Sequence, residues 1–151
     1  MTKNERMQAV FNLYLSEREH EPATTREVVE WAVAQGMLTL PNSDPYDMLA
    51  SQMAGALGQE FDTHKGHRYR VNHAVRETRN GTQQTFWAIM GYAPHDHMIK
   101  AFAQRREHIV GECVQLKTDV VVYNDMNVGE IQPVQMPMDF TEDVAERGVL
   151  N

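Results

Sequence analysis

The 151-residue sequence contains a single cysteine and no long hydrophobic run. One thiol excludes a disulfide within the chain and a zinc site built from several cysteines. No uncharged segment approaches the roughly 20 residues that a membrane-spanning helix needs, and no apolar signal-peptide core follows the charged N-terminal residues. We therefore expect a cytoplasmic protein that does not enter a membrane.

Motifs of known catalytic chemistry are missing as well. The sequence has no G-x-S-x-G nucleophile elbow, no P-loop, no dinucleotide-binding glycine motif and no H-E-x-x-H zinc motif. His95 and His97 lie near a predicted helix start, where positions i and i+2 point about 200° apart and cannot share one metal. Cys113 falls on an apolar helix face, which is typical of an inert thiol. We expect no catalysis, no cofactor and no metal site.

Positive charge is scarce overall but concentrated in one stretch. The formal net charge is −7, which argues against a general nucleic-acid coat protein. Residues 64–79 nevertheless carry five Lys or Arg residues and one Glu, whereas residues 122–151 carry six acids and one Arg. The middle of the chain is therefore basic and its end acidic.

Three helices are predicted in the first 60 residues. Apolar spacing indicates a helix over 4–18. Thr24 with Glu27 forms a capping-box pattern that begins a second helix, and Gly36 suits its end. Asp44 and Pro45 suit the start of a third helix that reaches about Glu60. The side chains expected to face a core are Met7, Val10, Phe11, Tyr14, Leu15, Val28, Val29, Ala32, Val33, Leu49, Met53, Ala56 and Leu57.

Two hairpins follow the third helix. A short strand over 61–63, a turn over 64–67 and a longer strand from Arg68 are predicted. Asn80-Gly81 is a strong signal for a two-residue hairpin turn. Counting outward from it pairs Val75 with Phe86, His73 with Ala88 and Val71 with Met90, on the face assigned to the core. The opposite face carries Arg70, Asn72, Arg76, Trp87 and Ile89. We expect a later segment or a second chain to cover Trp87 and Ile89.

After Pro94 a long helix is predicted over 94–124, with its regular part from His95 to Tyr123. Apolar residues repeat with heptad spacing over four heptads, broken by Arg106. The helix either folds back onto the sheet or pairs with a second copy, and the heptads favour a homodimer. The predicted dimer-interface residues are Ile99, Phe102, Arg106, Ile109, Cys113, Leu116, Val120 and Tyr123.

Residues 125–151 are predicted to form an extended acidic arm. Apolar residues alternate with prolines over 131–140 and run into acidic residues by 144. Three interpretations stay open. The arm packs on its own domain or a dimer mate, residues 131–144 bind a protein partner as a short linear motif, or the acidic arm covers the basic stretch and inhibits it.

The first half of the chain resembles a known family. The order helix, helix, helix, strand, turn, strand is that of a winged helix-turn-helix. The stretches 24–29 (TTREVV), 34–38 (AQGML), Asp44-Pro45, 57–61 and 66–71 (GHRYRV) are similar to the HARE-type winged helix over about residues 4–73. The resemblance implies a module found in DNA-linked and chromatin-linked proteins. We expect an α+β fold: a winged helix-turn-helix with an extended β-hairpin over 4–91, then the long helix and the arm.

The third helix departs from a sequence-reading DNA helix because it contains no Lys or Arg. Its Ser51 and Gln52 offer only hydrogen bonds to bases, so phosphate contacts must come from elsewhere. The predicted DNA-binding residues are Arg26, Ser51, Gln52, Lys65, His67, Arg68, Arg70 and Arg76. We expect a non-catalytic duplex DNA-binding dimer that acts in transcription or in mobile-element or host-defence regulation. The alternatives are a protein–protein adaptor that docks through the winged helix and arm, or an acidic DNA mimic.

Overall fold

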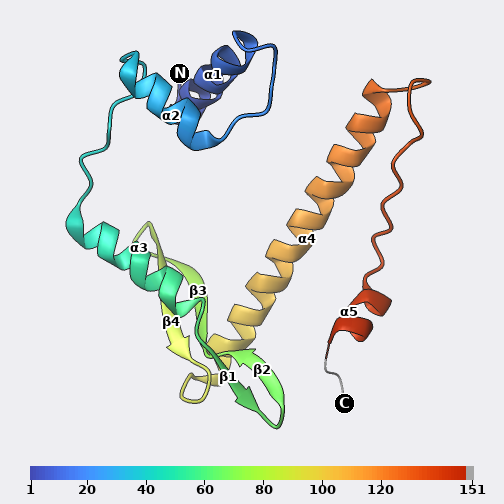
Figure 1. The fold of residues 1–151 in the computed structure, drawn as a ribbon. Helices are drawn as coiled ribbons and strands as arrows, with labels where there is room; N and C mark the ends of the chain where they lie inside the picture. The colour runs from blue at the N-terminus through green and yellow to red at the C-terminus, as the bar shows by residue number, and fades with distance from the viewer. Residues whose placement is uncertain (149–151) are drawn as a thin grey trace. The chain divides into compact units, whose positions relative to one another are not determined.

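The computed structural model describes residues 1–148 and has an α+β fold, with five helices and four strands in that range (Figure 1). Two compact units divide the chain, one over Met1–Leu49 and one from Ala50 onward. None of the described helices combines the length and apolar character required to cross a membrane.

The first unit is built on α1 (Lys3–Ser16) and α2 (Thr25–Ala34). Its core consists of Val10, Val28 and Ala32, with the rings of Tyr14 and Trp31 packed edge to face at 5.3 Å. The predicted inward residues Met7, Phe11 and Val29 are instead exposed. Two short helices share only a narrow stripe of contact, so the flanking apolar positions stay at the surface.

Helix ends in this unit follow local hydrogen-bond chemistry. The Thr24 hydroxyl accepts a hydrogen bond from the Glu27 N–H at 3.1 Å, as predicted. Gly36 adopts φ +74°, and the Gly36 and Met37 N–H groups donate to the carbonyls of Val33 and Ala32, which forms a Schellman motif. Thr2 and Glu5 form a full capping box at α1, a signal that the sequence analysis missed.

Helix α3 (Pro45–Leu57) begins where predicted, with the Asp44 carboxylate accepting from the Tyr46 N–H at 2.9 Å. It ends three residues before the predicted Glu60. The expectation that its apolar residues face a core is wrong for Leu49 and Met53, which are 63% and 64% exposed, and for Ala56. The first unit closes its core with residues of α1, α2 and the segments beside them, and Leu49 lies outside that cluster.

The second unit contains two antiparallel hairpins. Strand β1 (Phe61–His64) pairs with β2 (His67–Arg70), and β3 (Asn72–Arg79) pairs with β4 (Thr82–Ile89). The predicted Val75–Phe86 and His73–Ala88 pairs are confirmed. The single long strand predicted from Arg68 is interrupted at Val71, whose N–H donates to Glu60 O and whose carbonyl accepts from Met90 N–H. Residues before Val71 pair with β1, and residues after it pair with β4.

Helix α4 (His95–Met126) runs two residues past the predicted end at 124. Its first turns bury Met98 and Ala101, and Phe102 packs edge to face on the ring of His73 at 5.4 Å. The Gln104 amide then bonds both backbone groups of Arg76, each at 2.9 Å. The start of α4 therefore packs on β3, on the face that carries His73 and Val75.

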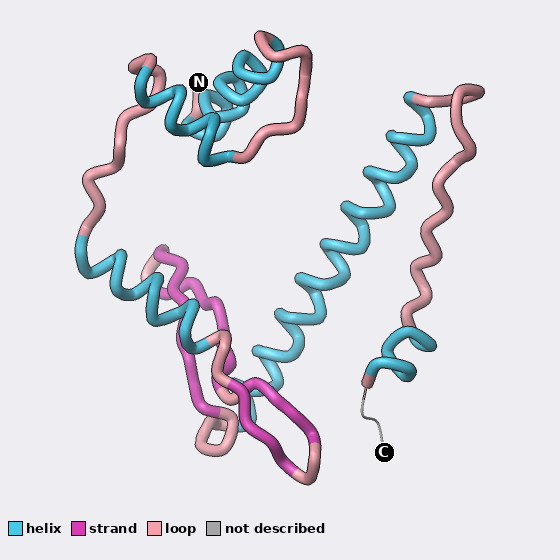
Figure 2. Tube along the Cα trace, in the orientation of Figure 1, coloured by secondary structure: helices cyan, strands magenta, loops and turns pink. Residues whose placement is uncertain are grey.

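Beyond α4 the chain turns at Gly129, which adopts φ +81°, and returns as the arm (residues 127–140), a loop in Figure 2. The Asn124 side chain holds it by accepting from Val134 N–H and donating to Val134 O, both at 2.9 Å. The expectation of a wholly extended arm is wrong, because α5 (Thr141–Arg147) forms a short helix. Hydrogen bonds from the side chain and the N–H of Thr141 lower the pKa of Asp139, and the bond from the N–H supports the first turn of α5.

We expect Asn72→Ala to destabilise the second unit. The buried Asn72 amide donates to Leu57 O at 3.1 Å and to Glu60 Oε1 at 2.8 Å, which joins the end of α3 to the start of β3. Its loss should lower the free energy of unfolding by about 1–3 kcal/mol in urea titrations. The exposed Asn12→Ala on α1 is the control, expected to stay within about 0.5 kcal/mol. Equal midpoints for the two variants would contradict this role.

Candidate nucleic-acid interface

The β1–β2 hairpin, here called the wing, divides the predicted basic residues between two faces. Direct pairing of Phe61 with Arg70 places those side chains on one face, and Arg68 lies on the same face two residues away. His67 lies on the opposite face of the hairpin from the two arginines. Lys65 lies at the turn, where its φ is +50°.

Phe61 supports both wing arginines. The guanidinium carbon of Arg68 lies 4.0 Å from the Phe61 ring centroid, and that of Arg70 lies 5.8 Å away. A guanidinium stacked on a ring keeps its N–H groups directed outward along its own plane. The ring thus restrains two cations while leaving their donors available to an anion.

A basic groove of about 730 Å³ lies between the β3–β4 sheet and α4. Arg70 and Arg76 line it from the strands, and Arg105 and His108 line it from the helix. Glu107 is the one acidic side chain that lines it. The sequence analysis missed Arg105 and His108; their three-residue spacing on the predicted helix was the signal for a shared face.

The arginines of the wing and groove carry free charge. Within residues 1–148 no ion pair involves Arg68, Arg70, Arg76 or Arg105. Elsewhere in this unit Glu77 binds both Arg79 and Lys100, at 3.0 and 3.4 Å, and hydrogen bonds from these two cations lower the pKa of Glu77. The chain therefore compensates some of its cations and leaves those of the groove unpaired.

The pKa of His73 is lowered by its surroundings beside the groove. Its buried ring donates from Nε2 to Arg70 O at 2.8 Å. Burial lowers the pKa of His73, and the positive charges of Arg105 and Arg70 lower it further. The imidazole is therefore held neutral.

Of the eight predicted DNA-binding residues, Arg70 and Arg76 line the basic groove. Arg26 belongs to the first unit, where it pairs with Glu30 at 2.9 Å on α2. Ser51 and Gln52 are exposed on α3 and do not line the basic groove. The groove is formed instead by strand and helix residues that lie far apart in the sequence.

A second surface follows the predicted dimer interface on α4, here called the seam. Five seam residues are 40–57% exposed, while Cys113 and Val120 are half-buried. The five exposed residues are Ile99, Phe102, Ile109, Leu116 and Tyr123. In the part of the chain that the structure describes, Arg106 pairs only with its neighbour Glu107, at 3.6 Å. The seam thus stays largely uncovered within the described chain.

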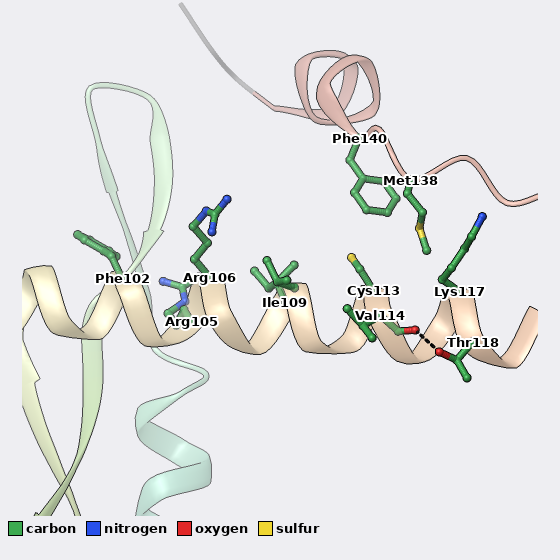
Figure 3. Close-up of a pocket in the computed structure, with 11 residues that line it drawn as sticks. Phe102, Arg105, Arg106, Ile109, Cys113, Val114, Lys117, Thr118, Met138 and Phe140 are labelled. Atoms are coloured by element: carbon green, nitrogen blue, oxygen red, sulfur yellow. Dashed lines mark hydrogen bonds between the residues drawn. The ribbon is translucent and has the colours of Figure 1, made fainter.

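An apolar groove of about 860 Å³ lies between α4 and the arm. Ile109, Cys113 and Val114 line it from the helix, and Met138 and Phe140 line it from the arm. Figure 3 shows both arm side chains pointing toward α4, opposite Cys113. The arm and its own helix thus line this groove together, and the three interpretations of the arm stay predictions.

Among residues 1–148 no group of three or more His, Cys, Asp or Glu side chains is placed to hold a metal ion. No family model, curated protein or solved structure matches this chain. The resemblance to the HARE-type winged helix therefore stays a prediction from the residues that carry it.

The depressed pKa of His73 predicts a pH dependence of stability. Below about pH 6.5 the unfolded chain protonates this imidazole while the folded chain resists it, so stability falls as the pH falls. His73→Gln retains an N–H donor but does not titrate. Urea unfolding from pH 7 to 5 should show a shallower decline for this variant, by at most about 1.4 kcal/mol per pH unit. Parallel profiles for the two proteins would show that His73 does not titrate in this window.

Proposed function

We propose that this protein binds duplex DNA without catalysis, as a dimer, through phosphate contacts from the wing and the basic groove. Its context would be transcription or the regulation of mobile elements or host defence. The observation that carries the proposal is the convergence of Arg70, Arg76 and Arg105 on one groove, with no ion partner among residues 1–148, in a chain of net charge −7.

The presence of unpaired arginines in an acidic protein supports an anionic ligand. In a protein with 21 acidic and 14 basic residues, cations are easily neutralised by neighbours, as Arg79 and Lys100 are by Glu77. Holding three arginines near one another without such partners raises the free energy of the unbound protein through like-charge repulsion. A polyanion removes that repulsion and uses the planar donors of each guanidinium.

The layout suits an extended backbone more than a single small anion. Arg68 and Arg70 stand on the Phe61 face of the wing, and the groove continues from Arg70 to Arg76 and Arg105. A row of cations that runs from a hairpin onto a sheet and helix contacts successive phosphates rather than one.

Base reading contributes little to this proposal. Helix α3 carries Ser51 and Gln52 but no cation, and the strongest positive groups lie on the wing and on α4. Arginine contacts to phosphates position a protein on the duplex and carry no sequence information. We therefore expect a weak preference between sequences and a strong dependence on salt.

A protein–protein adaptor is the second candidate function. The observation that favours it is the apolar groove between α4 and the arm, which offers a partner a surface unrelated to the arginines. An adaptor that uses this surface would tolerate loss of the groove cations, whereas a DNA-binding protein would not.

Salt-dependent binding tests the proposal. Four phosphate contacts should weaken binding about 10²-fold between 50 and 200 mM salt, measured by fluorescence anisotropy on a labelled random duplex. Arg70→Gln, Arg76→Gln and Arg105→Gln should each lower the log–log salt slope by about one. Binding that is absent at 50 mM, with the protein folded, would favour the adaptor.

Arg6→Gln serves as the matched control. Arg6 is an exposed arginine on α1, so its loss changes the net charge by the same amount as each groove variant. We expect its salt slope to equal that of the unsubstituted protein. A decrease as large as that of Arg76→Gln would show that only overall charge matters and would contradict a localised site.

A further inference from the structure

The seam on α4 extends well beyond the region that packs on the sheet. Contacts with β3 occupy the first turns, through Met98, Ala101 and Phe102. The remaining seam residues run to Tyr123 with the spacing of three and four that places them along one face. An exposed apolar face of this length on a helix of 32 residues needs a partner.

The arm stands beside this face and leaves one side of it open. Four seam residues line the apolar groove together with the arm: Phe102, Arg106, Ile109 and Cys113. Val110, Val114 and Lys117 line it as well. Glu112 and Asp119 do not line it and are exposed. A helix with apolar residues on a flank as well as on its seam typically has two neighbours. The arm is one of them, and the seam stays open to another on the side that carries Glu112 and Asp119.

The charged residues on and beside the seam indicate which kind of partner the second neighbour is. Leu116 lies on the seam, and the residues four before it and three after it are Glu112 and Asp119. These positions flank Leu116 on the helix surface, so an acidic pair surrounds one apolar seam residue. The one charged seam residue is Arg106, whose ion pair with Glu107 joins side chains that are 77% and 76% exposed. Such an exposed pair holds Arg106 weakly.

We propose that α4 of a second copy lies antiparallel on the seam, with the two-fold axis at Gly111. Residues equidistant from Gly111 then meet, and every seam residue finds another seam residue. The resulting layers are Ile99 with Tyr123, Phe102 with Val120, Arg106 with Leu116, and Ile109 with Cys113. Arg106 of each copy enters between Glu112 and Asp119 of the other, and the arm forms one wall beside the docked helix.

A parallel pairing fits the same residues less well. It would gain ion pairs between Glu112 and Lys117 of the two copies at the rim. It would also place Arg106 directly against Arg106 within the seam, where the two like charges repel each other. The antiparallel arrangement removes that repulsion and gives each Arg106 two carboxylates. The inference rests on the dimeric state in the proposed function and is independent of DNA binding.

The single native cysteine makes the orientation measurable by oxidation, without DNA. In the antiparallel dimer Cys113 meets Ile109, so Ile109→Cys should give a disulfide-linked dimer in high yield. The matched controls carry one thiol each: the unsubstituted protein keeps only Cys113, and the double variant Ile109→Cys/Cys113→Ser keeps only the introduced thiol. Both should stay non-covalent, because neither thiol meets its own copy. Ile109 is 57% exposed, so we expect its replacement by Cys to leave the fold intact. Circular dichroism of each variant checks this.

Light scattering separates the other outcomes. The unsubstituted protein should give twice the chain mass of 17.3 kDa at high micromolar concentration, and Arg106→Glu should weaken dimerisation at least tenfold. Covalent dimers in all three oxidised samples would indicate a parallel pair and overturn the proposal. A mass of 17.3 kDa would overturn the dimer itself, and a dimer without any cross-link would place the interface elsewhere. DNA binding that fails while Ile109→Cys cross-links would contradict only the proposed function.

Discussion

The side-chain amide of Gln104 is the contact on which the second unit depends. By bonding the N–H and carbonyl of Arg76, it takes the place of a neighbouring strand at the edge of β3 and fixes α4 to the sheet. His97 adds a second bond of the same kind, from its Nε2 to His73 O at 2.8 Å. Because these bonds involve the backbone, they set the position of α4 along β3. That position brings Arg105 to Arg76 and directs the rest of the seam away from the sheet.

The same contact explains how one helix serves two surfaces. The first turns of α4 pack on the face of β3 that carries His73 and Val75. The residues after Gln104 are left to form the two surfaces. Arg105 and Ile109 line both the basic groove and the apolar groove, so the two surfaces meet on α4. In the proposed dimer, pairing two copies through α4 would therefore also pair their two basic grooves.

Local signals made much of this fold predictable. Thr24, Gly36 and Asn80-Gly81 each determine backbone geometry within a few residues, and the predicted ends and register agree with the structure there. Burial was predicted less well, because exposure of Leu49 and Met53 depends on which elements close the core. Arg105 was missed for the same reason: its neighbours Arg70 and Arg76 are distant in sequence and meet it only through the α4–β3 contact.

The contact between Asn124 and Val134 determines how far along α4 the rest of the arm can reach. The Asn124 amide fixes Val134 at one point of α4, and six residues without helix or strand lead from there to Phe140. At about 3.3 Å each they span at most roughly 20 Å. The same distance along a helix takes about thirteen residues at 1.5 Å each, which leads from Asn124 to Gly111. The arm is therefore long enough for Phe140 to line the apolar groove with Ile109 and Cys113. A single insertion between 134 and 140 would lengthen this reach by about two helical residues.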